Sequence, residues 1–197
     1  MTARAKVLAF RSVGGTVDEV SDRALVAALA EGDQAALGAI YDRFQRDVHR
    51  FVGRMARDAE VDDLVQSTFL EAHRSASRFR GNSAVKTWLL GIAANLVRMH
   101  FRGEQRRRSA TTAFETAPQP PRPSPDDAIT EEQRRRWFAA AVDALTPALK
   151  EAYVLCVIEE LPGKDAADIL GIREASLWRR LSDARDALRR TIAEIQR

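Results

Sequence analysis

A proline-rich stretch at residues 109–128, SATTAFETAPQPPRPSPDDA, divides an otherwise helical pattern into two halves. Five of the chain's 7 prolines fall in it: Pro118, Pro120, Pro121, Pro123 and Pro125. Proline lacks the amide donor and clashes with the preceding turn, so this stretch cannot continue a helix. Loops longer than about 15 residues are uncommon inside one compact domain. We therefore interpret the stretch as a linker between two domains rather than as a long surface loop.

Four amphipathic helices are predicted before the linker, over about residues 22–103, and strand patterns are almost absent. Ser21 and Asp33 have the side chains that cap the first two helices. In the second helix apolar residues recur at steps of three and four, which predicts one buried stripe: Leu37, Ile40, Tyr41, Phe44, Val48, Phe51, Val52 and Met55. Similar stripes run over residues 61–72 and 85–96, so we expect a helical bundle.

Helices resume after the linker. Thr130 and Gln133 have the spacing of a capping box. Thr146 followed by Pro147 predicts a second helix start, and Leu161-Pro162-Gly163 predicts a stop. The expected fold class is all-α, with two small helical domains joined by the proline-rich linker.

The segment GKDAADILGIREASLWRRLSDAR (residues 163–185) has the order short helix, glycine turn, longer helix. Ala167 stands where two helices approach closely, and Gly171 stands at the turn, where a positive φ is expected. This spacing favours a DNA-binding helix-turn-helix over an ordinary helical hairpin. The second helix would offer these residues to bases or phosphates: Arg173, Glu174, Ser176, Trp178, Arg179, Arg180, Ser182, Arg185, Arg189 and Arg190. Packing against a neighbouring helix is the alternative for Trp178, and a solvated face is the alternative for Arg189 and Arg190.

Composition excludes several classes of protein. The chain has 197 residues, a formal net charge of +3, one cysteine and 3 histidines. No internal disulfide is therefore possible, and a structural zinc site is not expected. No apolar run reaches the roughly 20 residues that span a bilayer, and the N-terminus is too short and polar for a secretory signal. We expect a cytoplasmic protein without membrane insertion.

Arginine is concentrated in one segment. Between residues 98 and 108 there are five arginines, namely Arg98, Arg102, Arg106, Arg107 and Arg108, against one acid, Glu104. A basic patch on a nearly neutral chain indicates that one surface contacts a polyanion.

With these motifs in this order, the chain resembles the bacterial extracytoplasmic-function (ECF) sigma factors. The resemblance rests on VDDLVQSTFLEAHRSASRFRGNSAVKTWLLGIAANLVRMHFR (61–102) and on the helix-turn-helix domain. It implies a subunit that binds RNA polymerase core, through the β′ and β subunits, and promoter DNA. It also implies an anti-sigma factor as a partner, and neither enzymatic activity nor a cofactor. The implied domains are an N-terminal extension (1–20), a region-two-like domain (21–108), the linker (109–129) and a region-four-like domain (130–197).

The resemblance also assigns residues. The polymerase-binding set is Asp62, Asp63, Leu64, Gln66 and Phe69. Periodicity makes Leu64 and Phe69 core residues as well, so Asp62, Asp63 and Gln66 are the stronger candidates. The loop at residues 79–84 and the helix after it would read the −10 element: Arg80, Asn82, Ser83, Lys86, Asn95, Arg98, Arg102 and Arg106. The −35 set is Arg173, Glu174, Ser176, Trp178, Arg179, Arg180 and Arg185.

The chain departs from the family pattern at a few positions. Gly163 and Ala166 stand where larger residues are common, and Trp178 stands where a basic or small residue is usual. His73 replaces a common aromatic residue and Met99 a common acidic one. Trp88 has a spacing that favours core packing over a role in strand separation.

The sequence disfavours two alternatives to a sigma factor. A stand-alone helix-turn-helix regulator is disfavoured by the second basic patch, which lies before the linker. An all-helical enzyme is disfavoured because the sequence contains no HExxH motif, glycine-rich phosphate loop or nucleophile elbow. The adjacent acids Glu159 and Glu160 are interpreted as a solvated pair, because neighbouring residues on a helix point apart.

Overall fold

The computed structural model describes residues 21–109 and 130–195, with side chains for 21–103 and 130–194. Within these residues the regular structure is helical and no strand occurs. The chain forms two compact units, Met1–Arg102 and Gly103–Arg197. The proline-rich stretch of the sequence analysis lies almost wholly outside the described residues. An all-α fold with two helical units is thus confirmed.

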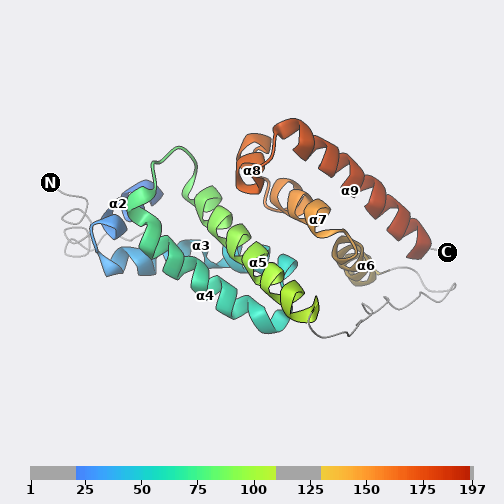
Figure 1. The fold of residues 1–197 in the computed structure, drawn as a ribbon, viewed down its shortest axis with the longest axis horizontal. Coiled ribbons are helices and arrows are strands. Elements are labelled where there is room, and N and C mark those ends of the chain that lie inside the picture. Colours follow the sequence, from blue (N-terminus) through green and yellow to red (C-terminus); the bar gives the residue numbers. More distant parts are fainter. Residues whose placement is uncertain (1–20, 110–129, 196–197) are drawn as a thin grey trace. The chain divides into compact units, whose positions relative to one another are not determined.

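The N-terminal unit contains α2 (Asp22–Ala30), α3 (Gln34–Met55), α4 (Asp58–Ser75), the short 3-10 turn η2 (Ala76–Arg78) and α5 (Val85–Ser109) (Figure 1). The expected caps are present. Ser21 Oγ accepts a hydrogen bond from the Ala24 amide at 3.3 Å, and Asp33 Oδ1 accepts one from the Ala35 amide at 2.9 Å. These caps begin α2 and α3 where the sequence predicted, because each satisfies an amide that has no partner inside its helix.

The core of this unit lies among the four α-helices. Phe51, Ile40 and Leu89 are fully buried there. Polar groups of α5 lie against two neighbouring helices: Lys86 Nζ lies 3.3 Å from Asp47 Oδ1 of α3, and His100 Nε2 lies 3.0 Å from Glu60 Oε1 of α4. The helices α4 and α5 therefore lie side by side (Figure 1).

The C-terminal unit contains α6 (Glu131–Asp143), α7 (Pro147–Tyr153), the π-helical turn η3 (Val154–Ile158), α8 (Gly163–Leu170) and α9 (Glu174–Ile195). The capping box at Thr130 and Gln133 is present, with the Gln133 amide donating to Thr130 Oγ1 at 3.2 Å. Pro147 is the first residue of α7, as predicted. The long helix α9 packs on α6, α7 and α8 (Figure 1).

The hydrophobic core of this unit joins α6, α7 and α9 through Val142, Tyr153 and Leu188. The chain then turns at Glu159 and Glu160 before α8. Glu160 has a left-handed backbone with φ of 56°, and Glu159 is buried, with 3% of its surface exposed. The interpretation of both acids as solvated is therefore wrong for Glu159. The unusual backbone at Glu160 changes the direction of the chain, which the helical spacing did not anticipate.

None of the described helices is both long enough and apolar enough to cross a membrane. In the same residues, no group of three or more histidine, cysteine or acidic side chains is placed to hold a metal ion.

Candidate functional site

The first candidate surface is an apolar groove of about 600 Å³ between α3 and α4. We call it the α3–α4 groove, and it is lined by Leu37, Gly38, Tyr41, Gln45, His49, Asp62, Val65, Gln66, Phe69 and Leu70. Phe69 forms part of its base, with 4% of the residue exposed, and its ring meets Tyr41 edge to face at 4.8 Å between centroids. Tyr41 and Leu70 stand on the surface, 40% and 47% exposed.

Three residues of the expected polymerase-binding set line this groove, and two do not. Asp62 and Gln66 are exposed along it and Phe69 lies beneath them. Asp63 is also exposed, but outside the groove lining. Leu64 is buried in the bundle.

The sequence pattern does not identify Tyr41 and Leu70 as surface residues. The helical period puts Tyr41 in the buried stripe of α3, but the side chain lines the open groove, so 40% of it is exposed. Leu70 follows Phe69 and falls outside the apolar period of α4. A leucine outside the period of an amphipathic helix is a signal that could have indicated an exposed apolar patch.

The second candidate surface is the loop between η2 and α5, residues 79–84. Gly81 has φ of 71°, a backbone that favours glycine. Arg80 and Asn82 are exposed on the loop and Ser83 is half-buried. Phe79 contacts Trp88 of α5 at 4.9 Å between ring centroids. Trp88 is half-buried and packs within the unit, so it holds the start of the loop against the helix that follows.

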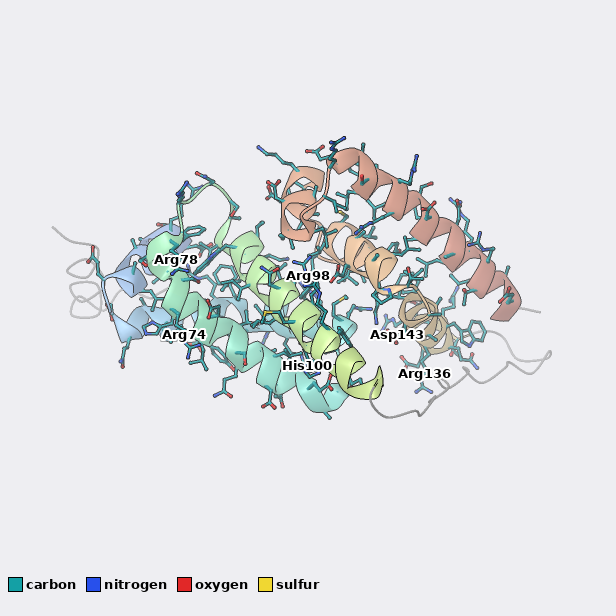
Figure 2. The ribbon with its side chains drawn as sticks, in the orientation of Figure 1. Arg74, Arg78, Arg98, His100, Arg136 and Asp143 are labelled. Atoms are coloured by element: carbon teal, nitrogen blue, oxygen red, sulfur yellow. The ribbon has the colours of Figure 1, made fainter. Side chains whose placement is uncertain are left out.

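The helix α5 continues this surface. Asn95, Met99 and Arg102 are exposed and share one face, because they stand four and three residues apart. Arg98, labelled on α5 in Figure 2, is half-buried and donates a hydrogen bond to Asn95 Oδ1. Lys86 is half-buried in its contact with Asp47. The Arg106 side chain, also in the expected −10 set, lies outside the described residues.

The third candidate surface is the helix-turn-helix formed by α8 and α9. Ala167 is 2% exposed where the two helices approach, and Gly171 has φ of 64°, as the sequence predicted. The Ile172 amide donates to the Ala167 carbonyl and the Gly171 amide donates to the Asp168 carbonyl. This pair of bonds is the Schellman ending of a helix, which requires the left-handed residue that glycine supplies.

The buried side of α9 carries Leu177 and Leu181, both at most 1% exposed. Its outer side carries the expected DNA-binding set. Those that are exposed are Arg173, Glu174, Ser176, Trp178, Arg179 and Arg185. Arg180 is half-buried. The structure thus brings the six exposed residues together at α9, five on the helix and Arg173 directly before it.

Cys156 lies half-buried in η3. Burial raises the pKa of its thiol, because a thiolate would lose hydration there, and the nearby Arg185 guanidinium offsets part of that rise. A thiol that is more difficult to ionise is a weak nucleophile, so Cys156 has the character of a packing residue.

Comparison with known proteins adds two family matches in the same order as the two units. The model for sigma-70 region 2 matches residues 40–107, and the model for sigma-70 region 4 matches residues 135–188. The chain is 32% identical over 177 residues to the ECF RNA polymerase sigma factor SigC of Mycobacterium tuberculosis, covering 87% of this chain and 91% of the relative. It is 27% identical to the ECF RNA polymerase sigma-E factor of Escherichia coli K12, covering 87% and 94%.

Solved structures agree on the fold. The structure of CnrH in complex with the cytosolic domain of CnrY matches with a TM-score of 0.65 at 24% identity, covering 88% of this chain and 97% of that one. The sigma factor RpoE in complex with the anti-sigma factor NepR from Bartonella quintana also gives 0.65, at 22% identity, covering 78% and 94%.

Proposed function

Because this chain belongs to the ECF sigma factors of bacterial RNA polymerase, we propose that it binds the core enzyme and directs it to promoters through the three surfaces described above. It is a recognition subunit and not an enzyme, since the polymerase performs the chemistry. The domains we assign are region two at 21–108, a linker at 109–129 and region four at 130–197, in the cytoplasm.

The α3–α4 groove is our candidate for docking on the polymerase. Exposed apolar side chains of Tyr41 and Leu70 beside Asp62 and Gln66 form a patch of the kind that marks protein interfaces, with an apolar centre and a polar rim. A helical coiled coil of the β′ subunit would lie in such a groove as an amphipathic helix lies in an apolar cleft. Asp63 adds a second exposed carboxylate beside it.

The loop at residues 79–84 is our candidate reader of the −10 element. Exposed Asn82 and half-buried Ser83 offer short polar side chains that could hydrogen-bond the edge of an unstacked base. The contact between Phe79 and Trp88 holds the loop in place for this task. Beyond it, Asn95 and Arg102 would follow the strand along α5, with Arg102 near the phosphates.

The helix α9 is our candidate reader of the −35 element in the major groove. Its N-terminal residues Arg173, Glu174 and Ser176 would reach base edges, while Arg185 would contact phosphate. The region-four unit would also contact the β subunit. Two promoter elements about two turns of DNA apart are separated by roughly 70 Å, so two tethered units suit the distance better than one small domain. Binding by both raises affinity through effective concentration.

An anti-sigma factor is the remaining proposed partner. Two structural neighbours are sigma factors, or proteins of that fold, solved with a bound partner. For this chain we propose that an anti-sigma factor would cover the α3–α4 groove and the outer side of α9. It would thereby prevent binding of both the polymerase and the promoter.

The observation that carries the proposal is the pairing of an apolar docking groove and a helix-turn-helix in separate units of a chain with ECF sigma relatives. Transcription from genomic DNA by purified core polymerase tests it, with start sites mapped in the presence and absence of the chain. We expect new start sites that share two upstream elements. Absence of both association and new start sites would contradict the proposal, while tight promoter binding without polymerase would favour a stand-alone regulator.

The docking surface has its own test in variants of α4. Gln66→Ala and Asp63→Ala should weaken association with core polymerase. Arg74→Ala is the matched control, since Arg74 is an exposed residue of the same helix outside the groove (Figure 2). Equal affinity for all three variants would contradict our assignment of the groove.

A further inference from the structure

Trp178 is unusual among the outer residues of α9 because it is large and apolar. It stands in the second turn of α9, one residue after the buried Leu177, and 52% of it is exposed. Its neighbours on the outer side are polar or charged, among them Glu174, Arg179 and Ser182. An indole this exposed within a polar surface calls for a reason beyond packing.

Gly163, the first residue of α8, lies directly beneath the indole. A Cβ added to Gly163 would come within 2.5 Å of Trp178 Cζ2, 3.1 Å of Cη2 and 3.4 Å of Cε2. Carbon atoms in van der Waals contact are about 3.5–4.0 Å apart, so any residue other than glycine would displace the ring.

The backbone does not explain the glycine at 163. The glycines with positive φ in the described residues are Gly32, Gly81 and Gly171, and Gly163 is not among them. Gly171 is the opposite case, because its backbone is left-handed and a Cβ added there would meet nothing within 4 Å. Gly163 is therefore required for the space it leaves, and the space is filled by the ring of Trp178.

The two departures from the family pattern noted at these positions thus form one structural feature. A large residue is absent at 163 and a large ring is present at 178, and the ring takes the volume of the missing side chain. Tryptophan has only two rotatable side-chain bonds, so contact along one edge of the indole is enough to fix its direction.

We propose that Gly163 and Trp178 together set the specificity of this chain for the −35 element, an inference that rests on the proposed function of α9. Trp178 contacts a base pair in the major groove, and Gly163 is a positioning residue that holds the indole in that orientation. Apart from its single Nε1–H donor the indole ring is apolar, and the apolar feature of the major groove is the C5-methyl group of thymine. The base that Trp178 favours is therefore thymine.

A promoter library with a randomised upstream element tests the pair, using holoenzyme assembled from core polymerase and the full chain. Transcripts are sequenced to give a base preference at each position. We expect Trp178→Ala to lower the preference for thymine at one base pair by roughly fivefold or more, the usual effect of losing one base contact. Gly163→Ala should disturb preference at that same base pair, and should have no further effect in the Trp178→Ala background.

Gly53→Ala is the matched control, because a Cβ added at Gly53, also within a helix, meets nothing within 4 Å. Its preference profile should equal that of the wild type. Association with core polymerase and the melting temperature are measured for every variant. If Gly163→Ala does not fold, Trp178→Ala still tests the base contact, and the double variant, which has no ring to displace, still tests the glycine.

The outcomes separate the inference from the function it rests on. An unchanged profile for Trp178→Ala overturns the inference, as does an equal effect of Gly163→Ala with and without the ring. In both cases wild-type holoenzyme still initiates, so the proposed function stands. A wild-type chain that directs no initiation would overturn both.

Discussion

Replacing Phe69 or Gln66 by alanine should separate what holds the α3–α4 groove together from what binds in it. The two residues are three positions apart on α4 and both line the groove, but Phe69 is 4% exposed and Gln66 is exposed. Phe69→Ala removes a buried ring and its edge-to-face contact with Tyr41. Gln66→Ala removes only an exposed amide.

The expected magnitudes differ accordingly. Truncation of a buried phenylalanine costs about 3–5 kcal/mol of unfolding free energy, and we expect the lower end because the groove is open and water can enter the space. A loss of about 3 kcal/mol increases the unfolded fraction by more than 100-fold. Substitution of an exposed side chain such as Gln66 usually changes stability by less than about 0.5 kcal/mol.

Hydrogen exchange measured by mass spectrometry on peptides from α3 and α4 gives the local stability of this unit, independently of the C-terminal one. Phe69→Ala should accelerate exchange in these peptides by about 100-fold. Gln66→Ala should leave exchange unchanged and weaken association with core polymerase by roughly fivefold, the effect of losing about 1 kcal/mol at an interface. Unchanged exchange in Phe69→Ala would refute its role in the core, and unchanged affinity in Gln66→Ala would refute the role of the groove rim.

Four further outcomes are expected. Ala167 is 2% exposed between α8 and α9, so Ala167→Leu should lower the free energy of unfolding by about 1–3 kcal/mol, measured by melting. The same variant should abolish dependence on the −35 element, measured by transcription from promoters with and without that element. Trp88→Ala removes the contact with Phe79 and should weaken discrimination at the −10 element while the −35 preference is unchanged, read in the same promoter library. Arg102→Ala should reduce the slope of the holoenzyme's log promoter affinity against log salt by about 0.7, as expected for one lost phosphate contact on a single strand. Alkylation of Cys156 should be slower in the folded chain than in denaturant at equal pH, because burial raises its pKa.

The controls for these variants lie in the same helices. Arg98→Ala should change the salt slope less than Arg102→Ala, because Arg98 is half-buried and bonded to Asn95.

The folded state of the C-terminal unit favours the neutral form of Cys156. The neutral thiol of Cys156 therefore contributes to the free energy of unfolding at pH values below the thiol pKa of the unfolded chain. This contribution is lost as the pH rises through the higher thiol pKa of the folded chain. Equal alkylation rates in the folded and denatured chain would contradict the burial of Cys156.

Local signals in the sequence predicted most of the fold. Ser21, Asp33 and Thr130 cap helices because their side-chain oxygens satisfy neighbouring amides, which is a property of a few adjacent residues. The positive φ of Gly171 is local in the same sense, since the turn between α8 and α9 requires it. The predicted all-α class followed from these signals together with the helical periodicity.

Features that depend on distant residues could not be predicted in this way. Periodicity assigned Tyr41 to the buried stripe, but its exposure depends on whether another helix covers that part of α3. Glu159 is buried because the backbone turns at Glu160, and no helical period encodes that turn. The contact of Gly163 with Trp178 joins two helices, so each residue alone indicated only a departure from a familiar pattern.

The overlap between a side chain at 163 and the ring at 178 also limits the order in which substitutions can accumulate at these positions. A chain with a bulky residue at 163 that gains tryptophan at 178 first must place two groups in one volume. Loss of the side chain at 163 first costs less than about 1 kcal/mol of helix propensity, because 163 is the first residue of α8, and leaves room for the ring. Once the ring is seated, a larger side chain can return at 163 only if Trp178 moves or is replaced, so we expect the two positions to change together.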